Sequence, residues 1–293
     1  MGIPESDLST WATIGAQTTS KNTYATIKTC IDGGTYPKRS CSFLQGSYGN
    51  DTNIRVESDV DVVMECNGMY YSDISSLPAD QQAAFNAARI GTNYSFQQFR
   101  TDVLTVLTQR FGRDVNPGTK AITISANGNR RKADVLACVE HHKYLSYSTI
   151  YPPVKEVVIC FFKSDGTKVV NYPRLHAAHL TTKNQNTAEW YKHIVRIFKN
   201  GRQKLIDSGA LAAGAAPSYY LEGLLYNVPN VHFGVSYSAS VFNCLKFLTE
   251  TNRSHFKCAN EQYPLLDGNA DVTWSSANCT AFLNSFVSMW NQW

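Results

Sequence analysis

Several features are missing from this 293-residue sequence, and each absence excludes a class of protein. No two of its 8 cysteines have the Cys-x-x-Cys spacing, so the spacing does not support a zinc site. No apolar run approaches the length of a membrane span, so we predict no membrane partner. The first residues lack a basic region followed by an apolar one, so we predict no signal peptide. We therefore expect reduced, buried thiols and a cytoplasmic location.

The sequence also lacks a large excess of positive or negative charge. The net charge is +4 and charged residues make up 17% of the chain, an excess that suits anionic ligands but does not by itself indicate nucleic acid as the main substrate. There is no internal repeat. Hydrophobic residues reach 43%, which is enough for a sizeable core, and the length predicts one large domain or two modest lobes.

The first half of the chain alternates between helical and strand patterns. Apolar residues recur at helical spacing over 19–32 and over 80–112, where Gly112 is a suitable cap. Alternating runs flank two turn dipeptides, Asn127-Gly128 and Asp165-Gly166, and each arrangement predicts a β-hairpin. This half therefore predicts a sheet of hairpins with helices packed on it, an α+β arrangement.

The second half predicts helices. A long helix is expected to start after Asn186 or Thr187, either of which can cap it, and to end near Gly209. Its apolar stripe includes Ile194 and Phe198, and a basic stripe on another face consists of Lys192, Arg196 and Lys199. The segments "PSYYLEGLLYNVP" and "ASVFNCLKFLTE" are typical of further helices.

The stretch "QGSYGNDTNIRVESDVDVVMEC" contains two aspartates that the strand pattern places side by side. A strand is predicted over Ser58–Cys66, and residues two apart in a strand point to the same face, so Asp59 and Asp61 project together. Two carboxylates on one face repel each other and lose hydration, at a cost of roughly several kcal/mol. A divalent cation offsets that cost, and Mg²⁺ prefers such oxygen ligands.

A third aspartate and a Gly-Ser pair complete the pattern. Asp134 lies in "RRKADVLACVEH", in the strand that leaves the Asn127-Gly128 hairpin, and could join the other two in a site for two metal ions. A salt bridge from Asp134 to Arg131 or Lys132 is the alternative. Gly46-Ser47 precedes the first aspartate, and a glycine followed by a serine lets a backbone turn approach phosphate oxygens.

These elements together resemble a known family. The order Gly-Ser, Asp-x-Asp and a third Asp is similar to that of the polymerase-β-type nucleotidyltransferases, and more narrowly of the bacterial cGAS/DncV-like nucleotidyltransferases, or CD-NTases. The segments "NYPRLHAAHLTTKNQNTAEWYKHIVRIFKN" and "PSYYLEGLLYNVPN" resemble the helical half of clade E of that family.

The resemblance implies a two-lobed α+β fold. A nucleotidyltransferase core with a mixed or antiparallel sheet would occupy 1–175, a C-terminal helical lobe would occupy 176–293, and an N-terminal helix would brace both. The implied activity is Mg²⁺-dependent condensation of nucleoside triphosphates into a cyclic oligonucleotide, most commonly a dinucleotide, with release of pyrophosphate. ATP, GTP and UTP are the candidate substrates, and in anti-phage (CBASS) signalling the product activates a downstream effector.

The resemblance also implies roles for individual residues. Asp59, Asp61 and Asp134 would be catalytic and would bind two Mg²⁺ ions, which Mn²⁺ could replace, with Asp134 helping to activate the attacking ribose hydroxyl. The residues that would bind the nucleotide through its triphosphate are Gln45, Gly46, Ser47, Lys199 and Ser218. A solvated helix face is the alternative for Lys199, and a simple helix N-cap is the alternative for Ser218.

The histidines and one charged run can be interpreted as structural or as functional residues. His176 and His179 could line a base pocket or serve packing, and clade E often has asparagine where this chain has His179, which leaves purine or pyrimidine choice open. His141-His142 are expected to be structural, because neighbours in a strand face opposite ways. The run at 130–132 is either an exposed charged hairpin or part of an RNA-activator patch with Arg196, Arg202 and Lys204.

Two other functions remain open at this stage. The same scaffold could make linear oligonucleotides or transfer nucleotides to RNA or protein as a toxin. It could also be a catalytically inactive RNA-binding scaffold, although three costly carboxylates kept together argue for an enzyme.

Overall fold

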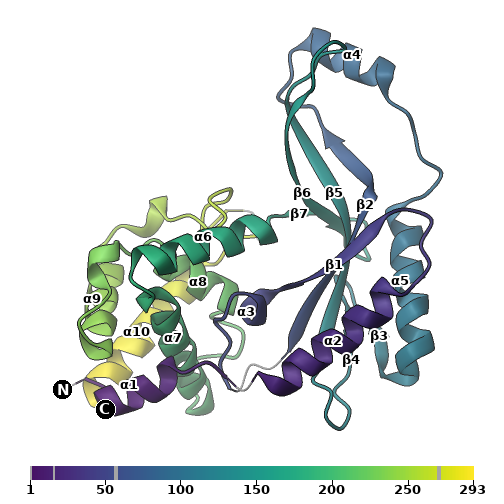
Figure 1. The fold of residues 1–293 in the computed structure, drawn as a ribbon. Helices are drawn as coiled ribbons and strands as arrows, with labels where there is room; N and C mark the ends of the chain where they lie inside the picture. Colours follow the sequence, from purple (N-terminus) through teal and green to yellow (C-terminus); the bar gives the residue numbers. More distant parts are fainter. Residues whose placement is uncertain (1, 16, 56–58, 269–271) are drawn as a thin grey trace. The chain divides into compact units, whose positions relative to one another are not determined.

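The computed structural model describes residues 2–15, 17–55, 59–268 and 272–293 (Figure 1). Contacts between Cα atoms divide the chain into two compact units. One unit holds Thr18–Leu44 and Asp59–Tyr172, and the other holds Met1–Gln17, Gln45–Ser58 and Pro173–Trp293. The prediction was a core over 1–175 and a helical lobe over 176–293. The division by contacts differs from it at 1–17 and 45–58, which are grouped with the C-terminal helices.

The first unit is built on a mixed sheet, seven-stranded within the described residues. Its strands are β1 (Ser40–Gln45), β2 (Val60–Asp73), β3 (Val115–Pro117), β4 (Ile122–Ile124), β5 (Ala133–Ser146), β6 (Val154–Phe162) and β7 (Lys168–Asn171). The long strand β5 is central, because β2 lies parallel along one edge while β4 and then β6 pair antiparallel with it. The expected α+β fold with a mixed sheet is confirmed.

Both predicted hairpins are present. β4 and β5 flank Gly128, β6 and β7 flank Gly166, and the two glycines have φ of 57° and 84°, in the left-handed region that glycine tolerates best. The predicted strand at Ser58–Cys66 is longer than expected and is bulged between Cys66 and Tyr70. Ser58 lies outside the described residues.

Helices cover one face of this sheet. α2 (Thr18–Asp32) packs on β2, and α5 (Phe96–Phe111) packs on β5 and on α2 (Figure 1). α5 starts with a capping box between Ser95 and Gln98 and ends at Gly112, as predicted, but the helical pattern at 80–112 is two helices because α4 (Ala79–Ala88) is separate. The core of the unit lies between these helices and the buried side chains of β2 and β5.

The second unit is helical. Its long helices are α1 (Glu5–Ala12), α6 (Pro173–Asn186), α7 (Trp190–Asp207), α8 (Ser218–Tyr226), α9 (Tyr237–Glu250) and α10 (Ser276–Gln292). α7 is central and packs on α1, α6, α8, α9 and α10. The predicted caps of α7 were wrong: its N-cap is Glu189, at φ 69°, although the Thr187 hydroxyl accepts a hydrogen bond from the Tyr191 N–H.

The predicted buried thiols are present at six of the eight cysteines, whereas Cys30 and Cys41 are partly exposed. All eight cysteines are free thiols, and Cys66, Cys138 and Cys160 are buried in strands. Among the helices of the described ranges, none combines the length and hydropathy required to cross a bilayer.

Candidate active site

Two of the three aspartates of the sequence pattern lie on neighbouring strands of the sheet, and the third, Asp59, directly precedes strand β2. Asp61 on β2 is the register partner of Asp134 on the parallel strand β5, so their Cα atoms lie opposite each other. Asp59 stands two residues before Asp61, and the intervening Val60 is fully buried on the other face, as is Val62. The predicted alternation, with one face packed and one face carrying carboxylates, is therefore present.

A lysine and a threonine hold two of these carboxylates. Lys132 Nζ lies 2.5 Å from Asp59 Oδ2 and 3.7 Å from Asp134 Oδ2. The Thr123 hydroxyl donates to Asp134 Oδ1 at 2.6 Å. The hydrogen bond to Asp59 raises the pKa of Lys132, against the opposing effect of its partial burial, so this side chain stays charged. The salt bridge from Asp134 to Lys132, one of the alternatives from sequence, is present.

The three carboxylates do not converge on a common metal position among the described residues. Within the described residues, no three histidine, cysteine, aspartate or glutamate side chains converge closely enough to hold a metal ion. The backbone register brings Asp61 and Asp134 opposite each other, while the carboxylates of Asp59 and Asp134 are directed to Lys132 and Thr123. A set of three carboxylates nevertheless has the oxygen donors and the charge that suit Mg²⁺.

The Gly-Ser pair lies in the helical unit, in a single helical turn, α3 (Gly46–Gly49). Gln45, in extended conformation, leads into the turn. Gly46 has φ of 70°, which only glycine adopts at low cost. The Asn50 N–H donates to the Gly46 carbonyl at 3.0 Å and the Thr52 N–H to the Ser47 carbonyl at 2.9 Å, so the turn is closed by backbone hydrogen bonds.

Lys199 lies in a different environment from the one the sequence predicted. Its side chain is 0% exposed, so the solvated helix face is wrong, and the basic stripe of α7 is not a surface feature at this position. Lys199 Nζ forms an ion pair with Glu222 Oε1 at 2.8 Å and donates to Thr52 Oγ1 at 3.2 Å. The ion pair offsets the free-energy cost of removing the ammonium group from water.

Ser218 is the first residue of α8 and is not its N-cap. Pro217 holds the cap position, so the simple capping role is wrong. Ser218 Oγ accepts a hydrogen bond from Arg202 Nη1 at 3.1 Å. The hydroxyl is thus placed next to a buried guanidinium at the start of the helix.

Two members of the proposed RNA-activator patch are buried. Arg196 and Arg202 are each 5% exposed and donate to backbone carbonyls, Arg196 to those of Ala12 and Asp51 and Arg202 to that of Ala216. A guanidinium committed to backbone oxygens cannot contact RNA phosphates, so the patch as predicted is wrong for these two residues.

The histidines are held by neighbouring polar groups. His141 and His142 are buried in β5, where His142 contacts Glu140 and Lys155 and His141 contacts Lys168, which agrees with a structural role. His179 Nδ1 lies 2.7 Å from the Ala259 carbonyl, and its ring stacks on Tyr226.

One residue that the sequence analysis missed is Glu222. It is 2% exposed and contacts Lys199, His176 and Thr52 through its carboxylate. The signal for it was present: in "PSYYLEGLLYNVP" it is the one acidic residue of an apolar helix. A carboxylate in such a position needs buried partners.

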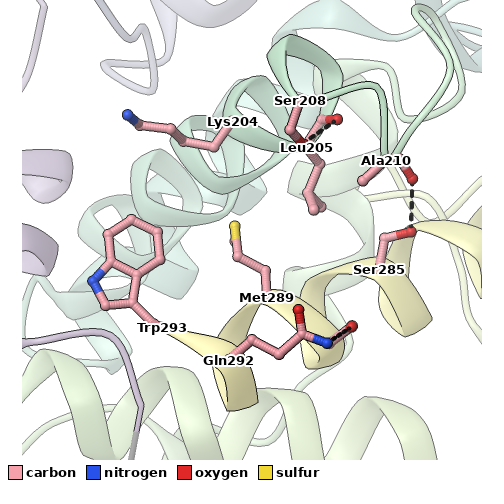
Figure 2. Close-up of a pocket in the computed structure, with 9 residues that line it drawn as sticks. Lys204, Leu205, Ser208, Ala210, Ser285, Met289, Gln292 and Trp293 are labelled. Atoms are coloured by element: carbon pink, nitrogen blue, oxygen red, sulfur yellow. Dashed lines mark hydrogen bonds between the residues drawn. The ribbon is translucent and has the colours of Figure 1, made fainter.

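A pocket of about 520 Å³ opens in the helical unit, between α7 and α10 (Figure 2). Met289 lies in its middle, and Lys204 and Trp293 lie at its edge. No residue predicted to bind nucleotide or metal lines it. The pocket therefore does not mark the site that the aspartates indicate.

Comparison with known proteins identifies the family. The C-terminal helical domain of cGAS/DncV-like nucleotidyltransferases matches residues 178–291. The cyclic UMP-AMP synthase of Rhodothermus marinus is 37% identical over 295 residues, covering 100% of this chain and 99% of the relative. Cyclic nucleotide synthase CdnE01 of Staphylococcus haemolyticus is 34% identical over 303 residues, covering 100% of both chains.

Solved structures agree over almost the whole chain. The R. marinus CdnE c-UMP-AMP synthase with Apcpp and Upnpp has a TM-score of 0.89 at 36% identity, covering 99% of this chain and 97% of that one. The Elizabethkingia meningoseptica CdnE cyclic dinucleotide synthase with GTP and Apcpp has a TM-score of 0.77 at 27% identity, covering 99% and 98%.

The mixed sheet, the aspartates on its face and the C-terminal helical unit together are those of a nucleotidyltransferase. The chain belongs to the cGAS/DncV-like nucleotidyltransferases, in the CdnE clade, and is a cyclic dinucleotide synthase. The resemblance that the sequence motifs indicated is confirmed.

Proposed function

We propose that Asp59, Asp61 and Asp134 are the catalytic carboxylates of this synthase. The observation that carries the proposal is the parallel register of β2 and β5, which sets Asp61 opposite Asp134, while Asp59 and Asp134 share the contact with Lys132. Their oxygens would hold two Mg²⁺ ions, which Mn²⁺ could replace. When bound, the metal supplies charge neutralisation at the transferring phosphate.

The triphosphate of the nucleotide is proposed to bind at the Gly46-Ser47 motif. Gln45, Gly46 and Ser47 would contact it through the turn α3, where Gly46 lets the backbone approach. Lys199 and Ser218 are assigned to the same function by the family resemblance. Lys199 Nζ donates a hydrogen bond to the hydroxyl of Thr52, whose N–H closes the turn. This contact connects Lys199 to the Gly-Ser motif.

The proposed reaction joins two nucleoside triphosphates in two rounds. In each, a ribose 3′- or 2′-hydroxyl attacks an α-phosphorus, a phosphodiester bond forms and pyrophosphate leaves. The first round gives a linear dinucleotide and the second closes the ring. Asp134 is proposed to help activate the attacking hydroxyl, and the hydrogen bond from Thr123 orients its carboxylate.

ATP, GTP and UTP are the proposed substrates. The related structures contain Apcpp with Upnpp, or GTP with Apcpp. Relatives also differ in product: besides the cyclic UMP-AMP synthase, they include a cyclic dipurine synthase that is 34% identical over 198 residues. We propose that the product acts in the cytoplasm as an anti-phage second messenger that activates a downstream effector.

The activity is tested by incubating the protein with four labelled nucleoside triphosphates and Mg²⁺, with and without cellular RNA. A phosphatase-resistant product is expected, and mass spectrometry with linkage-specific nucleases then identifies its bases and linkage. A phosphatase-sensitive 5′-triphosphate product indicates a linear synthase instead, and label transferred to RNA or protein indicates a toxin. Tight RNA binding without any product indicates an inactive scaffold.

Replacing Lys132 by methionine is expected to increase the affinity of the protein for Mn²⁺. The ammonium group repels a divalent cation that approaches Asp59 and Asp134, and methionine keeps an unbranched stem, one atom shorter, without the charge. Electron paramagnetic resonance of free Mn²⁺ during a titration measures the affinity directly. Lys143→Met, which removes a lysine paired with Glu156 on the same sheet, is the matched control and should leave the affinity unchanged. Weaker Mn²⁺ binding by K132M would contradict the assignment.

A further inference from the structure

A buried carboxylate collects hydrogen bonds from three separate parts of the helical unit. Glu222 on α8 accepts from Lys199 Nζ of α7 at 2.8 Å and contacts His176 Nε2 of α6 at 2.8 Å. It also accepts from the Thr52 hydroxyl at 2.5 Å and from Asn50 Nδ2 at 3.5 Å, both in the segment that follows α3. All five residues are at most 7% exposed.

The partners keep the carboxylate charged. Burial opposes ionisation of Glu222, but Lys199 and His176 outweigh it and hold the pKa of this carboxyl well below its usual range. An ionised carboxylate has no proton to give, so Nε2 of His176 carries the hydrogen of their contact. His176 Nδ1 is buried without a hydrogen-bond partner among the described residues, and the ring stacks on Tyr219.

The same two loop residues close the Gly46–Gly49 turn. The Thr52 N–H donates to the Ser47 carbonyl, and the Asn50 N–H donates to the Gly46 carbonyl. Their side chains are at the same time bonded to Glu222. Hydrogen bonds to a single carboxylate therefore tie the turn to α6, α7 and α8, beside the bond from Arg196 of α7 to the Asp51 carbonyl.

We propose that Glu222 is a positioning residue for nucleotide binding, which fixes the Gly46–Ser47 turn through Thr52 and Asn50. This inference rests on the proposed function of that turn as the triphosphate site. Lys199 and His176 act through Glu222, because the Lys199 ammonium and the hydrogen bonds from both side chains keep the carboxylate ionised and oriented. An apolar cluster of the same volume would pack as well, but it would not direct hydrogen bonds at the turn.

Thr52→Val tests the proposal with little change in volume. The variant removes the hydroxyl that bonds Glu222 and keeps the Lys199–Glu222 ion pair. We expect the KM for nucleoside triphosphates and the Kd for the analogue Apcpp with Mg²⁺, measured by calorimetry, to rise about tenfold, the size of one hydrogen bond to a charged group. The kcat should change little, and Thr52→Ser, which keeps the hydroxyl, should restore both constants.

A second variant keeps the test decisive if Thr52→Val does not fold. His176→Phe preserves stacking on Tyr219 and removes the donor to Glu222, and it should raise the same Kd. Thr181→Val, which removes an exposed hydroxyl of α6 bonded to the Ala177 carbonyl, is the matched control. If the wild type binds Apcpp and both variants bind it equally well, the positioning role is overturned. If the wild type itself binds no nucleotide, the assignment of the turn as the triphosphate site fails instead.

Discussion

Replacing Asp59 and Asp61 together by alanine is expected to lower the rate of product formation at least about a thousandfold, because under the proposed function each aspartate would supply oxygens that hold the metal ions at the transferring phosphate. The folded protein should survive the change. Both side chains lie on the face opposite the buried Val60 and Val62, so no core packing is lost. The change removes the repulsion between two carboxylates and also the half-exposed ion pair of Asp59 with Lys132, which contributes little to stability.

Product formation is measured with labelled nucleoside triphosphates, and folding is measured by thermal unfolding of the same samples. Glu156→Ala is the matched control, because it removes a half-exposed carboxylate from another strand of the same sheet. That variant should keep full activity. Unimpaired synthesis by the double aspartate variant would contradict the catalytic assignment, and so would a loss of activity explained by unfolding.

Replacing Lys199 by methionine is expected to lower the free energy of unfolding by about 3–5 kcal/mol, because it leaves the buried Glu222 carboxylate without its cation. Glu222→Gln should have a loss of similar size, since it leaves the ammonium of Lys199 buried and unpaired. The double variant removes both charges and should be more stable than either single variant. Urea unfolding of the wild type, the two single variants and the double variant gives the four free energies of a double-mutant cycle. If the losses of stability of the single variants simply add in the double variant, the two residues are not coupled.

The same pair predicts a dependence of stability on pH. The folded state lowers the pKa of Glu222 from its ordinary value of 4.5, so the stabilisation is present above that value and is lost as the pH falls below it. The wild type should therefore lose stability in acid faster than K199M, in which the main cause of the lowered pKa is absent. Equal acid sensitivity of the two proteins would contradict a buried, ionised Glu222.

The predictions of local structure succeeded where short-range patterns decide the outcome. The helix at 19–32 and the cap at Gly112 are present, as are the hairpins at Asn127-Gly128 and Asp165-Gly166. The prediction of one helical pattern at 80–112 missed the break between α4 and α5. The N-cap of α7 was also misplaced, because α6 runs almost directly into α7 through residues at positive φ, a connection set by packing between helices.

The environment of the charged residues of α7 could not be read from their spacing. Lys199 and Arg196 stand on a polar stripe of an amphipathic helix, which normally faces water. In the folded chain other segments cover that stripe: Arg196 donates to carbonyls of Ala12 and Asp51, and Lys199 pairs with Glu222. These partners lie far away in sequence, and only the packing of the unit brings them together.

The sequence by itself determined the class of this protein, the two hairpins and the alternation that puts Asp59 and Asp61 on one face of a strand. These features depend on residue order over short distances, where strand and turn geometry act directly. Tertiary structure alone decided that Asp61 faces Asp134 across parallel strands, that Lys132 lies between two carboxylates, and that Glu222 bonds Lys199 and Thr52. The physical reason is that ion pairs and strand register join residues distant in the chain, whose proximity is fixed only when the core packs.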